Sequence, residues 1–93
     1  MSSTCDCERT VVIANRHGLH ARPAAEFVKL ATTFRAHVLV AKDDLEVNGK
    51  SIMGIMMLAA EHGSEITIRA SGDDATEAVD SLAALVARRF GEE

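Results

Sequence analysis

The apolar residues of this chain repeat with two different periods, and the alternation between these periods limits the folds that it can adopt. Ile66, Ile68 and Ala70 are separated by single polar residues, a spacing that is typical of a strand with one buried face. Residues 75–86 instead place apolar side chains three or four positions apart, which favours an amphipathic helix. Because each element has one apolar face, strands and helices must pack against each other to bury both.

Applied to the whole chain, the two periods predict four strands and three helices. The expected strands span residues 8–14, 36–41, 45–47 and 64–71, and the expected helices span 21–33, 52–60 and a last segment after the turn at Gly72 and Asp73. Asp74 and Glu77 have capping-box spacing for this last helix, although the sequence leaves open which aspartate is the cap, and residues 91–93 are expected to fray. Strands with one polar face suit an antiparallel sheet. We therefore predict an α+β open-faced sandwich of order βαββαβα, a four-stranded antiparallel sheet with three helices on one face.

Length and composition indicate one small globular domain. The chain has 93 residues, of which 47% are hydrophobic, enough for a single core, and no apolar run is long enough to span a membrane. Residues 1–7 lack the basic start and apolar stretch of a signal peptide, so we expect a flexible leader over 1–7, a single domain over 8–93 and a cytoplasmic location. The net charge of −4 and the lack of a basic stripe argue against nucleic acid as a partner.

The two cysteines lie close together at the N-terminus. Cys5 and Cys7 are one residue apart, and their side chains diverge in an extended chain, so they bridge poorly. A metal site would have only Asp6 and Glu8 as further ligands nearby. We expect no metal site and interpret both cysteines as reduced thiols on a frayed tail.

Residues 18–25 (GLHARPAA) lie where a predicted strand passes into a predicted helix, and they carry the candidate chemistry. Pro23 is tolerated in a first helical turn, which puts His20 at or next to the N-cap. A helix N-terminus offers free N–H groups to an anion and keeps a nearby imidazole neutral and nucleophilic. Arg22 adds a guanidinium suited to phosphate oxygens. The pattern predicts a histidine that is phosphorylated and passes the group on; the alternative is a solvated loop histidine beside a surface arginine.

Ser51 and the apolar segment after it form a second feature. Serine is a favoured N-cap, which is sufficient to explain its position, although a phosphate there would add about two negative charges to this face. The short helix after Ser51 cannot bury all of its apolar side chains. We assign Ile52, Met53 and Met56 to an exposed docking surface, for which adaptable methionines are well suited, and two others to the core, Ile55 and Leu58.

Two strings carry a resemblance to a known family. Residues 18–24 (GLHARPA) and 50–58 (KSIMGIMML) resemble the active-site signature and the regulatory serine segment of HPr, the histidine-containing phosphocarrier of the bacterial phosphoenolpyruvate-dependent sugar phosphotransferase system. The resemblance covers residues 8–90. It implies that phospho-Enzyme I phosphorylates His20 on Nδ1, that the amides of Ala21 and Arg22 and the Arg22 side chain hold the phosphate, and that an Enzyme IIA domain receives it.

The resemblance also implies how this family meets its partners. They dock over the first two helices, for which we assign Ala21 and Ala25 in addition to the exposed residues of the second helix. An HPr serine kinase/phosphorylase would act on Ser51. No cofactor is implied, and the protein would be a monomer and a stoichiometric carrier more than a true catalyst.

His17 departs from the family pattern, because many members have a small polar residue there that caps the helix. The departure leaves open how the helix is capped and which branch of the family this is. The alternative to sugar transport is a regulatory binding module of a nitrogen or catabolite-control branch, and a third option is an unrelated small-molecule sensor. His37 lies on the polar phase of its strand, and we interpret it as solvated.

Overall fold

The computed structural model describes residues 6–92, with side chains from Cys7 onward. The elements are β1 (Asp6–Val12), α1 (Ala21–Ala31), β2 (His37–Lys42), β3 (Leu45–Asn48), α2 (Ile52–Met57), β4 (Glu65–Ser71), α3 (Ala75–Ala87) and a short 3₁₀ turn, η1 (Arg89–Gly91). This is the βαββαβα order that the periodicity predicts, followed by the additional turn η1.

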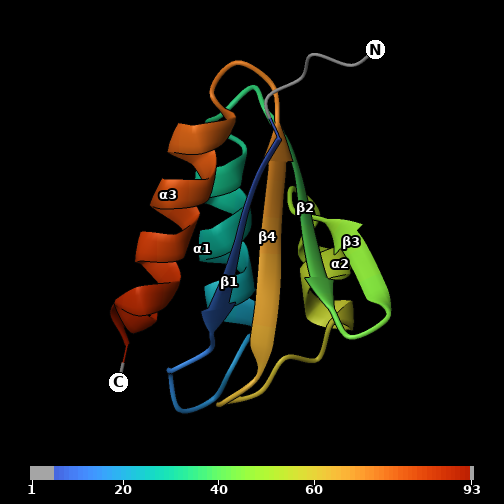
Figure 1. Ribbon diagram of the computed structural model, residues 1–93. Coiled ribbons are helices and arrows are strands. Elements are labelled where there is room, and N and C mark those ends of the chain that lie inside the picture. Colours follow the sequence, from blue (N-terminus) through green and yellow to red (C-terminus); the bar gives the residue numbers. More distant parts are fainter. Residues whose placement is uncertain (1–5, 93) are drawn as a thin grey trace.

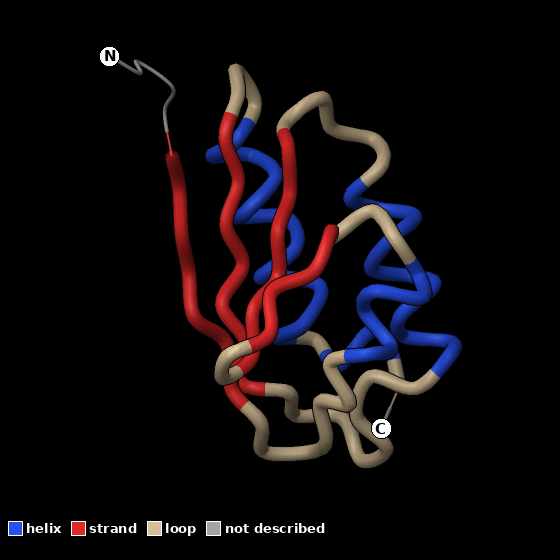
Figure 2. Tube along the Cα trace, turned by 90° about the vertical axis from the view of Figure 1, so that its right-hand side faces the viewer, coloured by secondary structure: helices blue, strands red, loops and turns tan. Residues whose placement is uncertain are grey.

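The four strands form one antiparallel sheet in the order β1-β4-β2-β3. Figure 1 shows α1 and α2 behind this sheet and α3 along the side of β1. In the view of Figure 2 the side of the strands that faces left carries no helix within residues 6–92. The predicted open-faced sandwich is confirmed.

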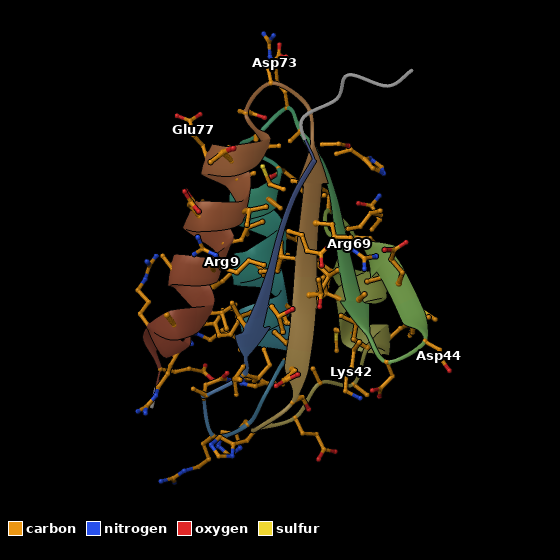
Figure 3. The ribbon with its side chains drawn as sticks, viewed as in Figure 1. Arg9, Lys42, Asp44, Arg69, Asp73 and Glu77 are labelled. Atoms are coloured by element: carbon orange, nitrogen blue, oxygen red, sulfur yellow. The ribbon has the colours of Figure 1, made fainter. Side chains whose placement is uncertain are left out.

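Burial follows the two periods in the sequence. Ile66, Ile68 and Ala70 point from β4 into the core, where they meet Phe27 of α1 and Leu82 of α3. The other side of the sheet is polar. There Arg69 lies between two carboxylates, with its Nε 3.1 Å from Glu8 Oε1 and its Nη1 2.7 Å from Glu46 Oε2, and it lies over the strands in Figure 3. His37 is exposed in β2, as expected.

The first strand begins two residues earlier than expected. Pairing with β4 extends to the partners Asp6 and Ser71, so Cys7 belongs to β1 and not to a frayed leader. Its partly buried thiol lies 3.1 Å from Thr76 Oγ1 of α3. Cys5 and the rest of the expected leader lie outside the described residues.

The helices are shorter than expected at their C-terminal ends. α1 ends at Ala31 instead of residue 33, and α2 ends at Met57 instead of residue 60. In α2 the amides of Leu58 and Ala59 bond three residues back, to Ile55 and Met56. Ala59 has a φ of 50°, and this left-handed conformation stops the helix.

The prediction of a capping box at the start of α3 is wrong. Asp74 is the N-cap, but its side chain makes no capping hydrogen bond. Its carboxylate instead accepts from the backbone N–H groups of Arg35 and Ala36, at 2.9 and 2.7 Å. These two amides precede β2 and are satisfied by this side chain from the start of α3.

Candidate functional site

The loop between β1 and α1 is fixed by hydrogen bonds to the segment between α2 and β4. The amide of Ile13 donates to Ser64 O and the amide of Leu19 donates to Ala60 O, each at 2.8 Å. Gly18, with a φ of 68°, approaches so closely that a Cβ atom there would lie 2.5 Å from Ala60 O. A glycine is therefore required at this turn, both for its conformation and for the space.

His20 lies where the sequence places it, at the N-cap of α1. Its backbone is extended, its side chain makes no capping bond, and that side chain is 41% exposed. Its carbonyl oxygen accepts from the amide of Ala24 at 3.0 Å. The amides of Ala21 and Arg22, which come before Ala24 in the first helical turn, have no acceptor within the helix. Pro23 has no N–H. The imidazole thus stands beside two amides that can receive an anion.

Glu92 contacts this histidine from the other end of the chain, and sequence reasoning missed it. Its Oε1 lies 3.1 Å from His20 Nε2, and its Oε2 accepts from Arg22 Nη1 at 2.6 Å. The expectation that residues 91–93 fray is wrong for Gly91 and Glu92. Phe90, which is 3% exposed, anchors this segment in the core, and an isolated apolar residue after the helical stripe was the one signal in the sequence.

Asn15 is a second residue that sequence reasoning missed. It is fully buried, and its Nδ2 donates to Gly18 O at 2.7 Å and to Glu92 Oε1 at 3.0 Å. Its Oδ1 has no hydrogen-bond partner among the described residues. A polar residue directly after the apolar stretch 11–14 carries no sequence signal that separates this role from that of an ordinary loop residue.

The contacts of Glu92 determine which ring nitrogen of His20 carries a proton. Its carboxyl pKa is lowered, chiefly by the hydrogen bond from His20 and then by those from Asn15 and Arg22, against the opposing effect of burial. The group is ionised at neutral pH and can only accept hydrogen bonds. Nε2 of His20 therefore carries a proton, and in the neutral ring the lone pair is on Nδ1.

His17 is exposed and lies beside His20, with the ring centroids 5.9 Å apart and the planes at 85°. Because His20 itself occupies the N-cap position, the bulky His17 does not take over the role of a small capping residue. Within residues 6–92, no group of three or more His, Cys, Asp or Glu side chains is arranged to hold a metal ion.

Ser51 is the N-cap of α2, as predicted. Its Oγ accepts from the amide of Gly54 at 3.0 Å, and the residue is partly exposed. This bond explains the serine structurally.

The exposed side of α2 is apolar. Ile52, Met53 and Met56 are 46%, 74% and 44% exposed, whereas Ile55 and Leu58 are buried. The division between surface and core made from the sequence is confirmed for these five residues. On the neighbouring helix α1, two residues with short side chains lie at the surface: Ala21 is exposed and Ala25 is partly exposed. Met57, also exposed at 63%, extends the apolar surface.

Comparison with known proteins identifies the family of this chain. Residues 7–88 match the family model of the PTS HPr component phosphorylation site. The chain belongs to the HPr family. The phosphocarrier protein HPr of Cupriavidus necator is 47% identical over 85 residues, which cover 91% of this chain and 96% of that protein. The HPr-like protein Crh of Bacillus subtilis is 47% identical over 79 residues, 85% of this chain and 93% of Crh.

Solved HPr structures share the architecture. HPr-C-His from Thermoanaerobacter tengcongensis superposes with a TM-score of 0.90 at 48% identity, covering 94% of this chain and 98% of that one. An HPr dimer from the same organism gives a TM-score of 0.75 at 48% identity, with 88% and 94% covered. The family and fold predicted from the sequence are thus confirmed.

The region matched by the family model includes His20 and Ser51 but ends before the segment that reaches back to the histidine. Glu92 lies four positions beyond residue 88, where the matched region stops. Within the described residues no helix is long and apolar enough to cross a membrane.

Proposed function

We propose that this HPr family member is a phosphocarrier, which accepts a phosphoryl group from phospho-Enzyme I on Nδ1 of His20 and passes it to an Enzyme IIA domain. One observation supports this most strongly. The bond between Nε2 and Glu92 leaves Nδ1 as the nucleophilic nitrogen, on a half-exposed ring at the N-terminus of α1.

The chemistry that we propose needs little covalent work from the protein. Phosphoryl transfer depends mainly on in-line positioning and on stabilising the charge of the phosphoryl oxygens. The first-turn amides of Ala21 and Arg22 and the Arg22 guanidinium supply that stabilisation. The bond to Glu92 occupies one of the five N–H donors of the guanidinium. No metal or cofactor takes part, and the protein acts as a stoichiometric intermediate more than as a catalyst.

The partners we propose dock over α1 and α2. Ala21 and Ala25 on α1 permit close approach, and the exposed side chains of Ile52, Met53 and Met56 on α2 supply apolar contact area. Flexible methionines adapt to partners of different shape, which a carrier between Enzyme I and Enzyme IIA requires. We also propose that the protein is cytoplasmic and that it is a monomer. Sedimentation tests the monomeric state, because an HPr dimer from Thermoanaerobacter tengcongensis is known.

Ser51 is the proposed target of an HPr serine kinase/phosphorylase. A phosphate at the N-cap of α2 is compatible with the helix dipole, so modification does not require α2 to unfold. Its effect would come from about two negative charges beside the apolar docking surface.

A regulatory module of a nitrogen or catabolite-control branch, not coupled to sugar transport, is the alternative. The identity of 47% to Crh, equal to that of the HPr of Cupriavidus necator, supports this alternative. The two functions differ in whether the chain carries phosphate to an Enzyme IIA domain.

The experiment incubates the protein with phosphoenolpyruvate and Enzyme I, followed by an Enzyme IIA domain. We expect one acid-labile, base-stable phosphate per chain and its transfer to Enzyme IIA. His20→Ala should neither accept the phosphate nor transfer it. His17→Ala is the matched control, because its ring lies next to His20, and it should still accept phosphate. Label that persists in His20→Ala would overturn the assignment, and label that Enzyme IIA does not accept would favour the regulatory alternative.

A further inference from the structure

The carboxylate of Glu92 joins three side chains around the histidine. Oε1 contacts His20 Nε2 at 3.1 Å and Asn15 Nδ2 at 3.0 Å, while Oε2 contacts Arg22 Nη1 at 2.6 Å. The Glu92 side chain is only 18% exposed. A side chain held by this many partners is fixed in position before any substrate arrives.

The turn before Glu92 is built to hold it there. Arg89 and Phe90 both have left-handed backbone conformations, with φ values of 59° and 56°, which are uncommon for residues other than glycine. Such strain persists only where the surroundings enforce it. Burial of Phe90 and the three bonds of Glu92 supply that enforcement at the two ends of the turn.

Asn15 fixes the orientation of the Glu92 carboxylate through its side-chain amide. Both hydrogens of its buried Nδ2 are used, one on Gly18 O and one on Glu92 Oε1. Turning the amide over would place Oδ1 against two oxygen atoms, so the observed orientation is the one that the surroundings allow. The unpaired Oδ1 is the cost of pointing the amide N–H groups at Glu92.

We propose that Glu92 is a positioning residue for phosphoryl transfer at His20: its carboxylate keeps the proton on Nε2 and stabilises the positive charge that the ring gains when Nδ1 is phosphorylated. This inference rests on the proposed phosphocarrier function. In the step, the Nδ1 lone pair forms the new N–P bond as the bond between phosphorus and the donor atom of phospho-Enzyme I breaks, and the electron pair of that bond stays on the donor atom. The Nε2 proton stays, so the phosphorylated ring is cationic, 3.1 Å from the carboxylate.

Arg22 is the other charged group beside this ring, and its effect is opposite to that of Glu92. Its guanidinium donates to the same carboxylate, and the ring of His17 lies nearly perpendicular to that of His20, with 5.9 Å between the centroids. Arg16, His62 and Arg89 line a separate hollow with Ala14. Because the positive guanidinium of Arg22 disfavours positive charge on the imidazole, removal of the Glu92 carboxylate should make the phosphorylated ring lose its proton more easily.

The test uses the phosphorylated full-length chain freed of Enzyme I. An N–P bond breaks more readily when the ring is protonated, because the leaving imidazole is then neutral, so spontaneous hydrolysis accelerates as pH falls. We expect the midpoint of this pH profile to move down by about one pH unit in Glu92→Gln and Glu92→Ala, the effect of losing one adjacent opposite charge. Glu26→Gln, which removes an exposed carboxylate from α1, is the matched control and should keep the wild-type profile.

A second measurement separates failure of this inference from failure of the proposed function. The ¹⁵N NMR spectrum of the unphosphorylated protein should show a proton on Nε2 of His20 and a hydrogen bond there that disappears in Glu92→Ala. If both Glu92 variants fold and accept phosphate but hydrolyse with the wild-type pH profile, the inference is overturned and the carrier function stands. If wild-type His20 accepts no phosphate at all, both fall.

Discussion

The carboxylate of Asp74 accepts a hydrogen bond of 2.7 Å from the backbone amide of Ala36, which ties the start of α3 to the start of β2. The same carboxylate accepts from the amide of Arg35, and the Lys50 side chain adds a favourable charge nearby. The pKa of Asp74 is lowered, most of all by the bond from Arg35, with burial acting in the opposite direction. An ionised Asp74 is therefore part of what holds the two elements together.

Asp74→Asn should lower the melting temperature at neutral pH, because the amide is a weaker acceptor than the carboxylate. A group with a lowered folded-state pKa contributes stability that is present above its unfolded value, here near 3.8, and that is lost as pH falls through the folded value. The difference between wild type and variant should shrink below about pH 4. Thermal unfolding from pH 2 to 7 measures this, and a difference that does not depend on pH contradicts it.

Gly18 and Gly63 form a matched pair for testing the turn before His20. Both have positive φ, but a Cβ at Gly18 would meet backbone atoms of Ala60 and Glu61 at 2.5 and 2.8 Å, whereas at Gly63 nothing lies within 4 Å. Gly63→Ala should cost about 1 kcal/mol from conformation alone. Gly18→Ala should cost about 3 kcal/mol or more and reduce phosphorylation of His20, because the loop must shift. Equal losses of stability in denaturant unfolding would show that the close approach is unimportant.

The order of the elements and the position of His20 follow from local signals. Period-two and period-3.6 spacing identify strands and helices, and Pro23 marks the first turn of α1. These features depend on neighbours a few residues away, so one sequence is sufficient to read them. The exposed side of α2 was predictable for a similar reason, because a short helix has room for only a few buried side chains.

The contacts that complete the site depend on residues far apart in the chain. Glu92 and His20 are separated by 72 positions, and neither the turn at Phe90 nor the burial of Asn15 has a local pattern. Asp74 shows the same limit: the sequence left open which aspartate caps α3, and the direction of the Asp74 side chain was not predictable, because the amides of Arg35 and Ala36 belong to another part of the chain.

Ser51→Asp should slow phosphoryl transfer from Enzyme I without destabilising the fold. Aspartate caps a helix about as well as serine, so α2 should persist, while its charge repels the phosphoryl group carried by the partner. We expect kcat/KM for transfer to fall about tenfold, equivalent to roughly 1.4 kcal/mol of repulsion. Ser51→Asn is the control, because asparagine has nearly the same shape as aspartate and also caps a helix, but adds no charge. If both variants transfer at the wild-type rate, Ser51 is a cap only.

Met53 provides the sharpest test of the docking surface, because it is 74% exposed and its removal leaves the core intact. Met53→Ala should raise the KM for Enzyme I about tenfold, the loss expected at an important interface position, with little change in melting temperature. Ile55→Ala, two residues further along α2 but fully buried, should instead cost about 2–5 kcal/mol of stability.

Val12→Ala is the matched control for Met53. Val12 is also exposed, at 51%, but it lies in β1, at the opposite edge of the sheet from β3 and the adjoining α2. Both substitutions remove a similar kind of apolar surface, so an equal rise in KM would mean that partners do not prefer the α2 face. A rise confined to Met53→Ala would locate recognition on the exposed side of α2, next to α1, at whose N-cap His20 lies.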